Sequence, residues 1–144
     1  MKRFLDLAAS DFKNISKKDL LNSIVASEGR VLMSEIIPHL NPTLYQISDA
    51  ELAAAMGADI ILLNMLDVNK PLIKGIPIEQ GPEAVEELKR LVGRPLGINL
   101  EPVSESIGLE LPELKFNKGR KATTENAIKA RDLGIKFILI TGNP

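Results

Sequence analysis

One pattern occurs four times and constrains the fold more than any other feature: a glycine precedes a short apolar run that ends in a polar residue. The polar residue follows the glycine by six or seven positions, in the segments Gly29 to Glu35, Gly57 to Asn64, Gly93 to Asn99 and Gly134 to Thr141. Glycine is favoured just past a helix, where its left-handed conformation caps the last turn. Nearly continuous apolar runs are typical of parallel strands, which are covered on both faces. The repeat therefore predicts alternating helices and parallel strands.

Helix start signals stand at matching distances before these glycines. Ser16 and Ser48 open capping-box sequences, Pro82 suits a first helical position, and Thr123 or Thr124 can cap the last helix. We predict helices near residues 17–27, 48–56, 82–92 and 123–133, and strands near 30–36, 59–65, 95–101 and 136–142. Residues 1–28 form an N-terminal helical segment before the first strand, and residues 1–144 form a single domain.

Such an alternation predicts the α/β class, with a parallel sheet of four strands built from (β/α) repeats. We interpret these units as half of a TIM-type barrel. The alternative interpretation is an open flavodoxin-like sheet. A barrel segment has the strand order 1-2-3-4, whereas a flavodoxin-like sheet has the order 2-1-3-4. A half barrel would be truncated after its fourth strand and would leave two strand edges open, so we expect a homo-oligomer.

Composition excludes several classes of function. The net charge of −1 and the aromatic content of 3% offer neither a basic field nor stacking platforms for nucleic acid. The absence of cysteine excludes thiolate zinc sites and thiol nucleophiles, and it suits a cytoplasmic location. No apolar stretch approaches the roughly 18 residues of a membrane-spanning helix. We therefore expect a cytoplasmic protein that acts on a small molecule, with no nucleic-acid or membrane partner.

Long loops and polar side chains follow the predicted strands. The segments 66–81 and 102–122 lie on the side of the sheet where α/β proteins place their sites. Because side chains alternate along a strand, one face of each strand turns polar near its carboxyl end. The residues concerned are Glu35, Asn64, Asn99, Glu101, Thr141 and Asn143. Carboxylates and amides gathered there would be costly without partners, which predicts a binding site.

Two kinds of chemistry fit this set. Glu35 and Glu101 could act as general acid and base if their environments separate their pKa values. Together with Asp67, they could instead hold a divalent cation such as Mg²⁺ through oxygen ligands. Asn64, Asn99, Thr141 and Asn143 would orient the substrate.

Charged residues in the loops add two further candidates. His39 is the only histidine and follows the first predicted strand, where it could transfer protons near neutral pH. Lys118 and Arg120 precede the helix start at Thr123, where a basic cluster beside free backbone N–H groups could bind a phosphate or carboxylate.

Several runs together resemble an uncharacterised bacterial family. They are Ala26-Ser27-Glu28-Gly29-Arg30, Gly57-Ala58-Asp59-Ile60-Ile61-Leu62-Leu63-Asn64, Asn99-Leu100-Glu101-Pro102-Val103 and Thr141-Gly142-Asn143-Pro144. The resemblance implies a TIM-barrel-like fold and an association with sugar phosphotransferase systems. Members of that family are longer and are sometimes labelled haloacid dehalogenase-like hydrolases. The DxD motif of dehalogenases does not occur in this sequence.

The leading functional hypothesis is therefore that the chain is part of a cytoplasmic TIM-barrel enzyme of carbohydrate metabolism. It would be a lyase, isomerase or hydrolase that acts on a small phosphorylated or acidic metabolite. The alternative is a non-catalytic ligand-binding or regulatory module associated with sugar transport. A third hypothesis, which goes with the open flavodoxin-like sheet, is an interaction protein.

Overall fold

Four parallel strands with helices between them form the centre of the molecule. The computed structural model describes residues 2–103 and 118–141. The strands are β1 (Met33–Ile36), β2 (Ile60–Leu63), β3 (Leu96–Leu100) and β4 (Phe137–Ile140), in the order β1-β2-β3-β4. Between them lie α3 (Asp49–Ala55), α4 (Pro82–Val92) and α6 (Thr124–Asp132). The predicted α/β class is confirmed. The strand order fits an open sheet or a barrel segment, and it differs from the flavodoxin-like order.

The helix boundaries follow the predicted local signals. Ser48 accepts a hydrogen bond from the backbone N–H of Glu51, whose carboxylate accepts one from Ser48 N in return. Ser16 caps α2 (Lys17–Ala26), and Thr123 caps α6, through single side-chain hydrogen bonds. All four glycines of the repeat have positive φ angles, namely Gly29, Gly57, Gly93 and Gly134. Local backbone chemistry thus sets where each unit begins and ends.

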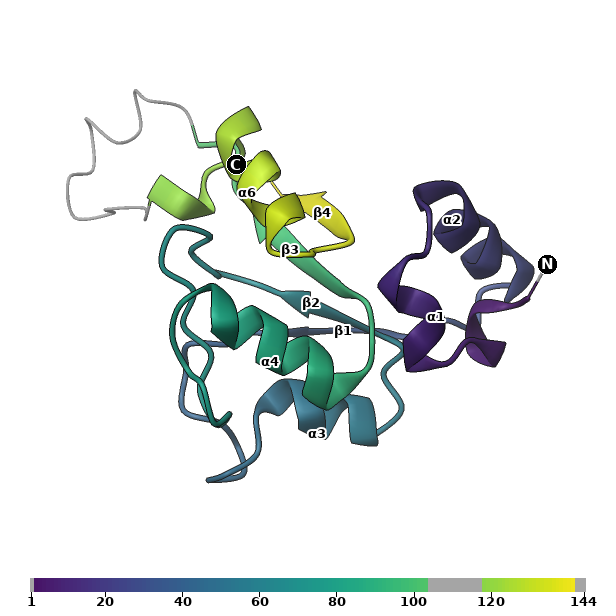
Figure 1. Ribbon diagram of the computed structural model, residues 1–144, viewed down its shortest axis with the longest axis horizontal. Coiled ribbons are helices and arrows are strands. Elements are labelled where there is room, and N and C mark those ends of the chain that lie inside the picture. The colour runs from purple at the N-terminus through teal and green to yellow at the C-terminus, as the bar shows by residue number, and fades with distance from the viewer. Residues whose placement is uncertain (1, 104–117, 142–144) are drawn as a thin grey trace.

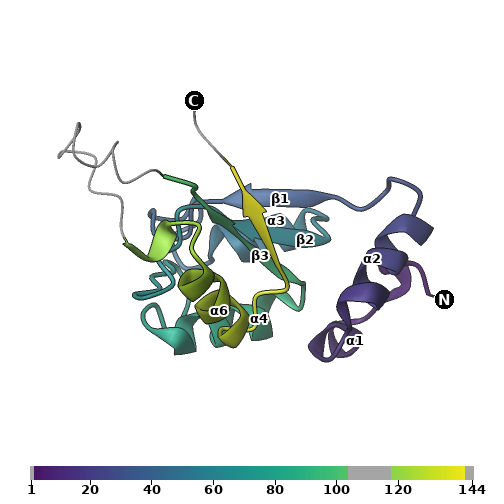
Figure 2. The same ribbon diagram turned by 90° about the horizontal axis from the view of Figure 1, so that it is seen from above.

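The main core lies between one face of the sheet and the helices. Ile61, Leu63 and Ile98 of the sheet are completely buried, and they belong to one cluster with Leu88 of α4 and Ala130 of α6. Figures 1 and 2 show α3, α4 and α6 on the same side of the curved sheet. The opposite face of the sheet, which we call the open face, carries no helix of this group.

The N-terminal elements cover one end of the open face. They are η1 (Phe4–Asp6), α1 (Ala9–Lys13) and α2, and Figure 1 shows them at the end of the sheet where the strands begin. Phe4, Phe12 and Leu20 pack around Ile60, the first residue of β2, and the two phenylalanine rings are 5.0 Å apart. The predicted N-terminal helical segment is therefore present, as a second small core.

Toward the outer strands the open face keeps apolar groups in contact with solvent. Met33 of β1 is 46% exposed and Leu139 of β4 is 39% exposed. Both strands are also edges of the sheet, with free hydrogen-bonding groups. The homo-oligomer stays a prediction, and these two edges are where it would form.

Candidate functional site

The polar residues at the strand ends share the open face but are staggered. Leu62 pairs in register with Glu35 on one side and with Gly97 on the other. Asn64 follows Leu62 by two positions, and Asn99 follows Gly97 by two positions. Asn99 Nδ2 donates a hydrogen bond to Asn64 Oδ1 at 3.1 Å. The structure therefore brings the two asparagines together. It places the exposed Glu35 level with Leu62, which is two residues nearer the beginning of the strand than Asn64.

Glu101 is not a free carboxylate, because Arg120 binds it. One guanidinium nitrogen of Arg120 donates to Glu101 Oε1 at 2.5 Å, and the two side chains are only 15% and 11% exposed. Backbone hydrogen bonds hold the same contact, from Glu101 N to Arg120 O and from Ala122 N to Glu101 O. The predicted acid–base residue and the predicted anion-binding residue are thus partners of each other.

Two buried acceptors beside this ion pair have no donor. Glu101 Oε2 and Asn99 Oδ1 are both buried and accept no hydrogen bond from residues 2–103 or 118–141. A buried polar atom left without a partner costs about 1–3 kcal/mol. Native proteins usually satisfy such atoms with protein groups, ordered water or a ligand. Both acceptors therefore suit a group that donates hydrogen bonds, such as a hydroxyl.

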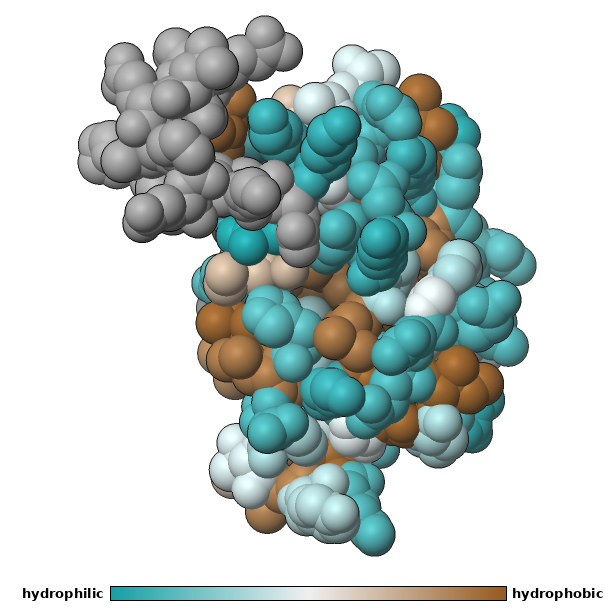
Figure 3. Space-filling view, turned by 90° about the vertical axis from the view of Figure 1, so that its left-hand side faces the viewer, coloured by the Kyte–Doolittle hydropathy of each residue, from teal (hydrophilic) through white to brown (hydrophobic). Residues whose placement is uncertain are grey.

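A pocket of about 560 Å³ lies beside Arg120, and we call it the strand-end pocket. The loops after β1 and β2 and the short helix η2 (Lys118–Arg120) form its walls. Four of the residues predicted from the sequence line it, namely His39, Asp67, Lys118 and Arg120, together with Asn69 and Lys70. Figure 3 looks onto this end of the molecule, where hydrophilic and hydrophobic side chains are interspersed.

The lining of the strand-end pocket contains more positively than negatively charged side chains. Within the described part of the chain, the ammonium groups of Lys70 and Lys118 have neither a hydrogen-bond nor an ion-pair partner. Asp67 is the one carboxylate in the lining, and its Oδ1 accepts a hydrogen bond from the backbone N–H of Asn69 at 2.8 Å. Positive groups therefore outnumber negative ones, which favours an anionic ligand.

Two residues that sequence reasoning missed position η2. Asn126 is 4% exposed, and its Nδ2 donates to the carbonyl oxygens of Lys118 at 2.7 Å and Lys121 at 2.8 Å. Gly119 packs so closely that a Cβ there would lie 1.7 Å from Asp67 Oδ1. An asparagine in the first turn of the helix after a basic loop is the only sequence signal for this arrangement.

The backbone is unusual at the end of β2. Met65 follows Asn64, lines the strand-end pocket and has a φ of 61°, in the left-handed region that a side chain makes unfavourable. Such conformations persist where surrounding contacts enforce them, and they gather at functional sites. This position supports the assignment of the strand-end pocket as the candidate site.

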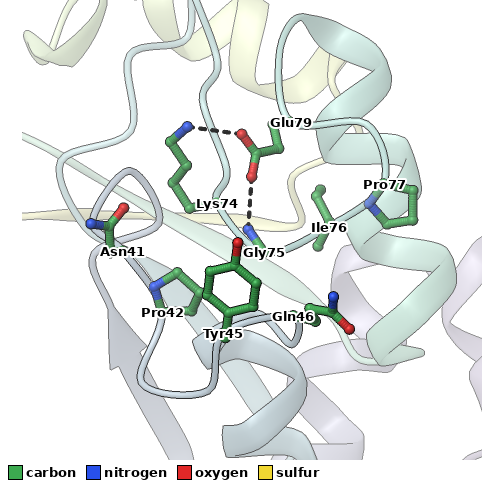
Figure 4. A pocket seen from close by; sticks show the side chains of 9 residues that line it. All are labelled: Asn41, Pro42, Tyr45, Gln46, Lys74, Gly75, Ile76, Pro77 and Glu79. Carbon is green, nitrogen blue, oxygen red and sulfur yellow. Dashed lines mark hydrogen bonds and ion pairs between the residues drawn. The ribbon is translucent and has the colours of Figure 1, made fainter.

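A second pocket of about 570 Å³, which we call the loop pocket, lies between the loops after β1 and β2 (Figure 4). Tyr45 forms one wall, and Lys74 donates to Glu79 Oε2 at 2.8 Å across it. The backbone N–H of Gly75 donates to the other carboxylate oxygen at 3.1 Å. None of the residues predicted from the sequence lines this pocket. Its lysine and carboxylate are already paired, so it is the weaker candidate for an anion.

The hydrogen bonds to Glu79 make this loop sensitive to acid. The Lys74 side chain and then the Gly75 N–H lower the pKa of the Glu79 carboxyl below its ordinary value of 4.5. A lowered pKa in the folded state contributes stability above the unfolded value, and this contribution is lost as the pH falls through the folded value. We expect the midpoint of the pH titration of the loop's NMR signals to lie below the ordinary glutamate pKa of 4.5. Glu79→Gln should abolish that transition, and an unaltered transition in the variant would contradict the assignment.

The remaining predicted residues do not join the pocket. In residues 2–103 and 118–141 no group of three or more histidine, cysteine, aspartate or glutamate side chains could hold a metal ion. Glu35, Asp67 and Glu101 are thus not gathered as a ligand set for Mg²⁺. Thr141 is exposed at the end of β4, and Asn143 lies outside the described residues.

Among the described residues, every helix is too short or too polar to span a lipid bilayer.

Comparisons with known proteins identify a family but no activity. No curated protein and no solved structure matches the chain. A family model described as a domain of unknown function, DUF7916, matches residues 5–144. This range includes every strand of the sheet and every residue of the strand-end pocket. The chain belongs to the DUF7916 family.

Proposed function

We propose that the strand-end pocket binds a small metabolite with a phosphate or carboxylate group, as part of a cytoplasmic α/β enzyme. The observation that carries this proposal is the excess of positive charge in a pocket at the carboxyl ends of parallel strands. Ligands of α/β proteins bind at this end of the sheet. Lys70 and Lys118 supply the charge for the anion, because Arg120 already compensates Glu101.

The polar groups behind Arg120 support a ligand that also carries hydroxyl groups. Glu101 Oε2 and Asn99 Oδ1 lack donors, and a hydroxyl can donate to either atom. His39 lines the pocket and is the group best suited to transfer a proton near neutral pH. In this proposal His39 acts as the acid or base, while Glu101 and the Asn64–Asn99 pair orient the substrate.

The resemblance described above leads us to propose a phosphorylated intermediate of carbohydrate metabolism as the substrate. A lyase, isomerase or hydrolase reaction is compatible with proton transfer by His39 and with an anionic ligand. The second candidate is a non-catalytic regulatory module associated with sugar transport. It is favoured by the Arg120–Glu101 ion pair, because an arginine already engaged by a carboxylate is less available to stabilise the charge that develops in a transition state.

A thermal-shift and NMR titration with phosphorylated sugars tests the proposed binding. A ligand at about a hundred times its dissociation constant should add roughly 2.7 kcal/mol to the free energy of unfolding. Lys118→Gln and Lys70→Gln should each weaken binding about tenfold, the effect of losing about 1.4 kcal/mol. Lys18→Gln, at an exposed position of α2, is the matched control.

The same titration separates the two candidates. Turnover that is lost in His39→Gln while binding persists would support the enzyme. Saturable binding without turnover of any ligand that binds would support the regulatory module. Equal affinities in Lys118→Gln, Lys70→Gln and the control would contradict the site itself.

A further inference from the structure

A third pocket lies at the other end of the molecule, where the strands begin, and we call it the basal pocket. Its volume is about 650 Å³. Four segments form it: α1, the last turns of α4, the residues leading into β3 and the turn before β4. It shares no residue with the strand-end pocket. Five basic residues line it, namely Lys13, Lys89, Arg90, Arg94 and Lys136, whereas Glu86 is its one acidic residue.

Two of these positive charges are compensated locally. Lys89 pairs with Glu86 at 2.5 Å. Arg90 makes two hydrogen bonds to the carboxylate of Glu87, at 2.7 and 2.8 Å. Both pairs lie on the surface of α4, where ion pairs three residues apart are common. The charges of Lys89 and Arg90 are therefore compensated without any ligand.

The other three positive charges have no carboxylate. Lys136 Nζ donates to the backbone carbonyl of Lys13 at 3.0 Å, which leaves its charge uncompensated. The side chains of Lys13 and Arg94 form no hydrogen bond or ion pair with any described residue. The whole chain carries a net charge of −1, so this local excess departs from the overall balance. A concave surface lined by charges of one sign concentrates counter-ions.

The basal pocket also has an apolar inner wall. Phe12 and Leu96, which line it, are 4% and 1% exposed, and Pro95 lies beside them. Gly93 adopts a left-handed conformation at the end of α4, and a Cβ there would lie 3.1 Å from the Cβ of Ala9. The pocket thus joins the N-terminal helices to the (β/α) units, with positive groups on both sides of the junction.

We propose that the basal pocket binds a diphosphate group, either free or as part of a nucleotide. Lys13 on α1, Arg94 before β3 and Lys136 before β4 approach the pocket from three segments, so one anion with several oxygens can contact all of them. Arginine binds phosphate with paired hydrogen bonds, and lysine binds it as a point charge. A bound diphosphate would hold α1 against the sheet.

Isothermal titration of the whole chain with pyrophosphate, ADP and adenosine tests this proposal. We expect pyrophosphate and ADP to bind and adenosine not to bind, with affinity that falls as the salt concentration rises. Arg94→Gln and Lys13→Gln should each weaken binding about tenfold, which corresponds to roughly 1.4 kcal/mol. Lys18→Gln, at an exposed position of α2 outside both pockets, is the matched control for loss of one lysine and should leave this binding unchanged.

The proposal fails if neither pyrophosphate nor ADP binds, if adenosine binds as tightly as ADP, or if Lys18→Gln weakens binding as much as Lys13→Gln. Tighter binding of ADP than of pyrophosphate would assign the diphosphate to a nucleotide, and equal binding would assign it to a free anion. Lys13 is exposed on α1, so its variant keeps the test valid even if Arg94→Gln unfolds.

Discussion

Replacing Arg120 by glutamine should lower the free energy of unfolding by about 3 kcal/mol, because it leaves a nearly buried carboxylate without its counter-charge. The Glu101 side chain is only 11% exposed, and Arg120 donates to its Oε1 at 2.5 Å. The other carboxylate oxygen accepts no hydrogen bond from the described residues, so none of them already shares the charge with Arg120. Urea unfolding of the variant, followed by circular dichroism, measures the loss.

Two further variants separate the charge from the shape of the side chain. Glu101→Gln removes the buried charge and should cost less than Arg120→Gln. The double variant should be more stable than Arg120→Gln alone, because a neutral amide replaces the stranded carboxylate. A loss below about 1 kcal/mol in Arg120→Gln would mean that solvent screens the pair as it does at an ordinary surface.

The elements of the fold could be predicted because their signals are local. Ser48 and Glu51 form their capping box within one turn of helix, and the glycine after each helix takes its positive φ wherever the chain leads next. Short apolar runs then have only one economical arrangement, a parallel sheet covered by the helices. The strand order did not follow from these signals, because they are compatible with both 1-2-3-4 and 2-1-3-4, and the structure has the first.

The register of the strands could not be predicted from the spacing of residues after the glycines. Glu35 follows its glycine by six positions and Asn64 follows its own by seven, a nearly equal spacing that by itself predicts side chains at the same level of the sheet. In the sheet Glu35 instead pairs with Leu62, and Asn64 lies two residues further along. Register depends on contacts between neighbouring strands and helices, which spacing within one strand does not contain.

Contacts between distant segments explain what sequence reasoning missed at the sites. Arg120 and Glu101 are 19 positions apart, and their pairing requires β3 to continue into the bridge between Glu101 and Lys121. Lys13 and Lys136 are 123 positions apart, so nothing in either neighbourhood indicates the basal pocket. The sequence placed the candidate residues at the end of the sheet where the strand-end pocket lies, but it did not identify the contacts between them.

The second large effect is expected from Gly97→Ala in β3. A Cβ at this position would lie 2.1 Å from Cζ and 2.3 Å from Cε2 of Phe137, so the phenylalanine ring occupies the space of the missing side chain. Phe137 also packs against the core formed by Phe4, Phe12 and Ile60. The ring or the strand must therefore shift from its packed position, and overpacking of this kind costs about 1–3 kcal/mol.

A double-mutant cycle shows whether the ring is the cause. Phe137→Leu alone should be destabilising, but Gly97→Ala combined with Phe137→Leu should cost clearly less than the sum of the two single variants. Additive losses would mean that β3 needs glycine at position 97 for its backbone conformation, and not because the Phe137 ring occupies the space of a side chain.

Asn99 lies two residues further on the same face of β3 and donates to Asn64. If alanine displaces β3 as well as the ring, NMR signals of both asparagine amide groups will move. If only the ring moves, the asparagine signals will stay in place, and the strand-end site is then independent of how the other end of the open face is packed.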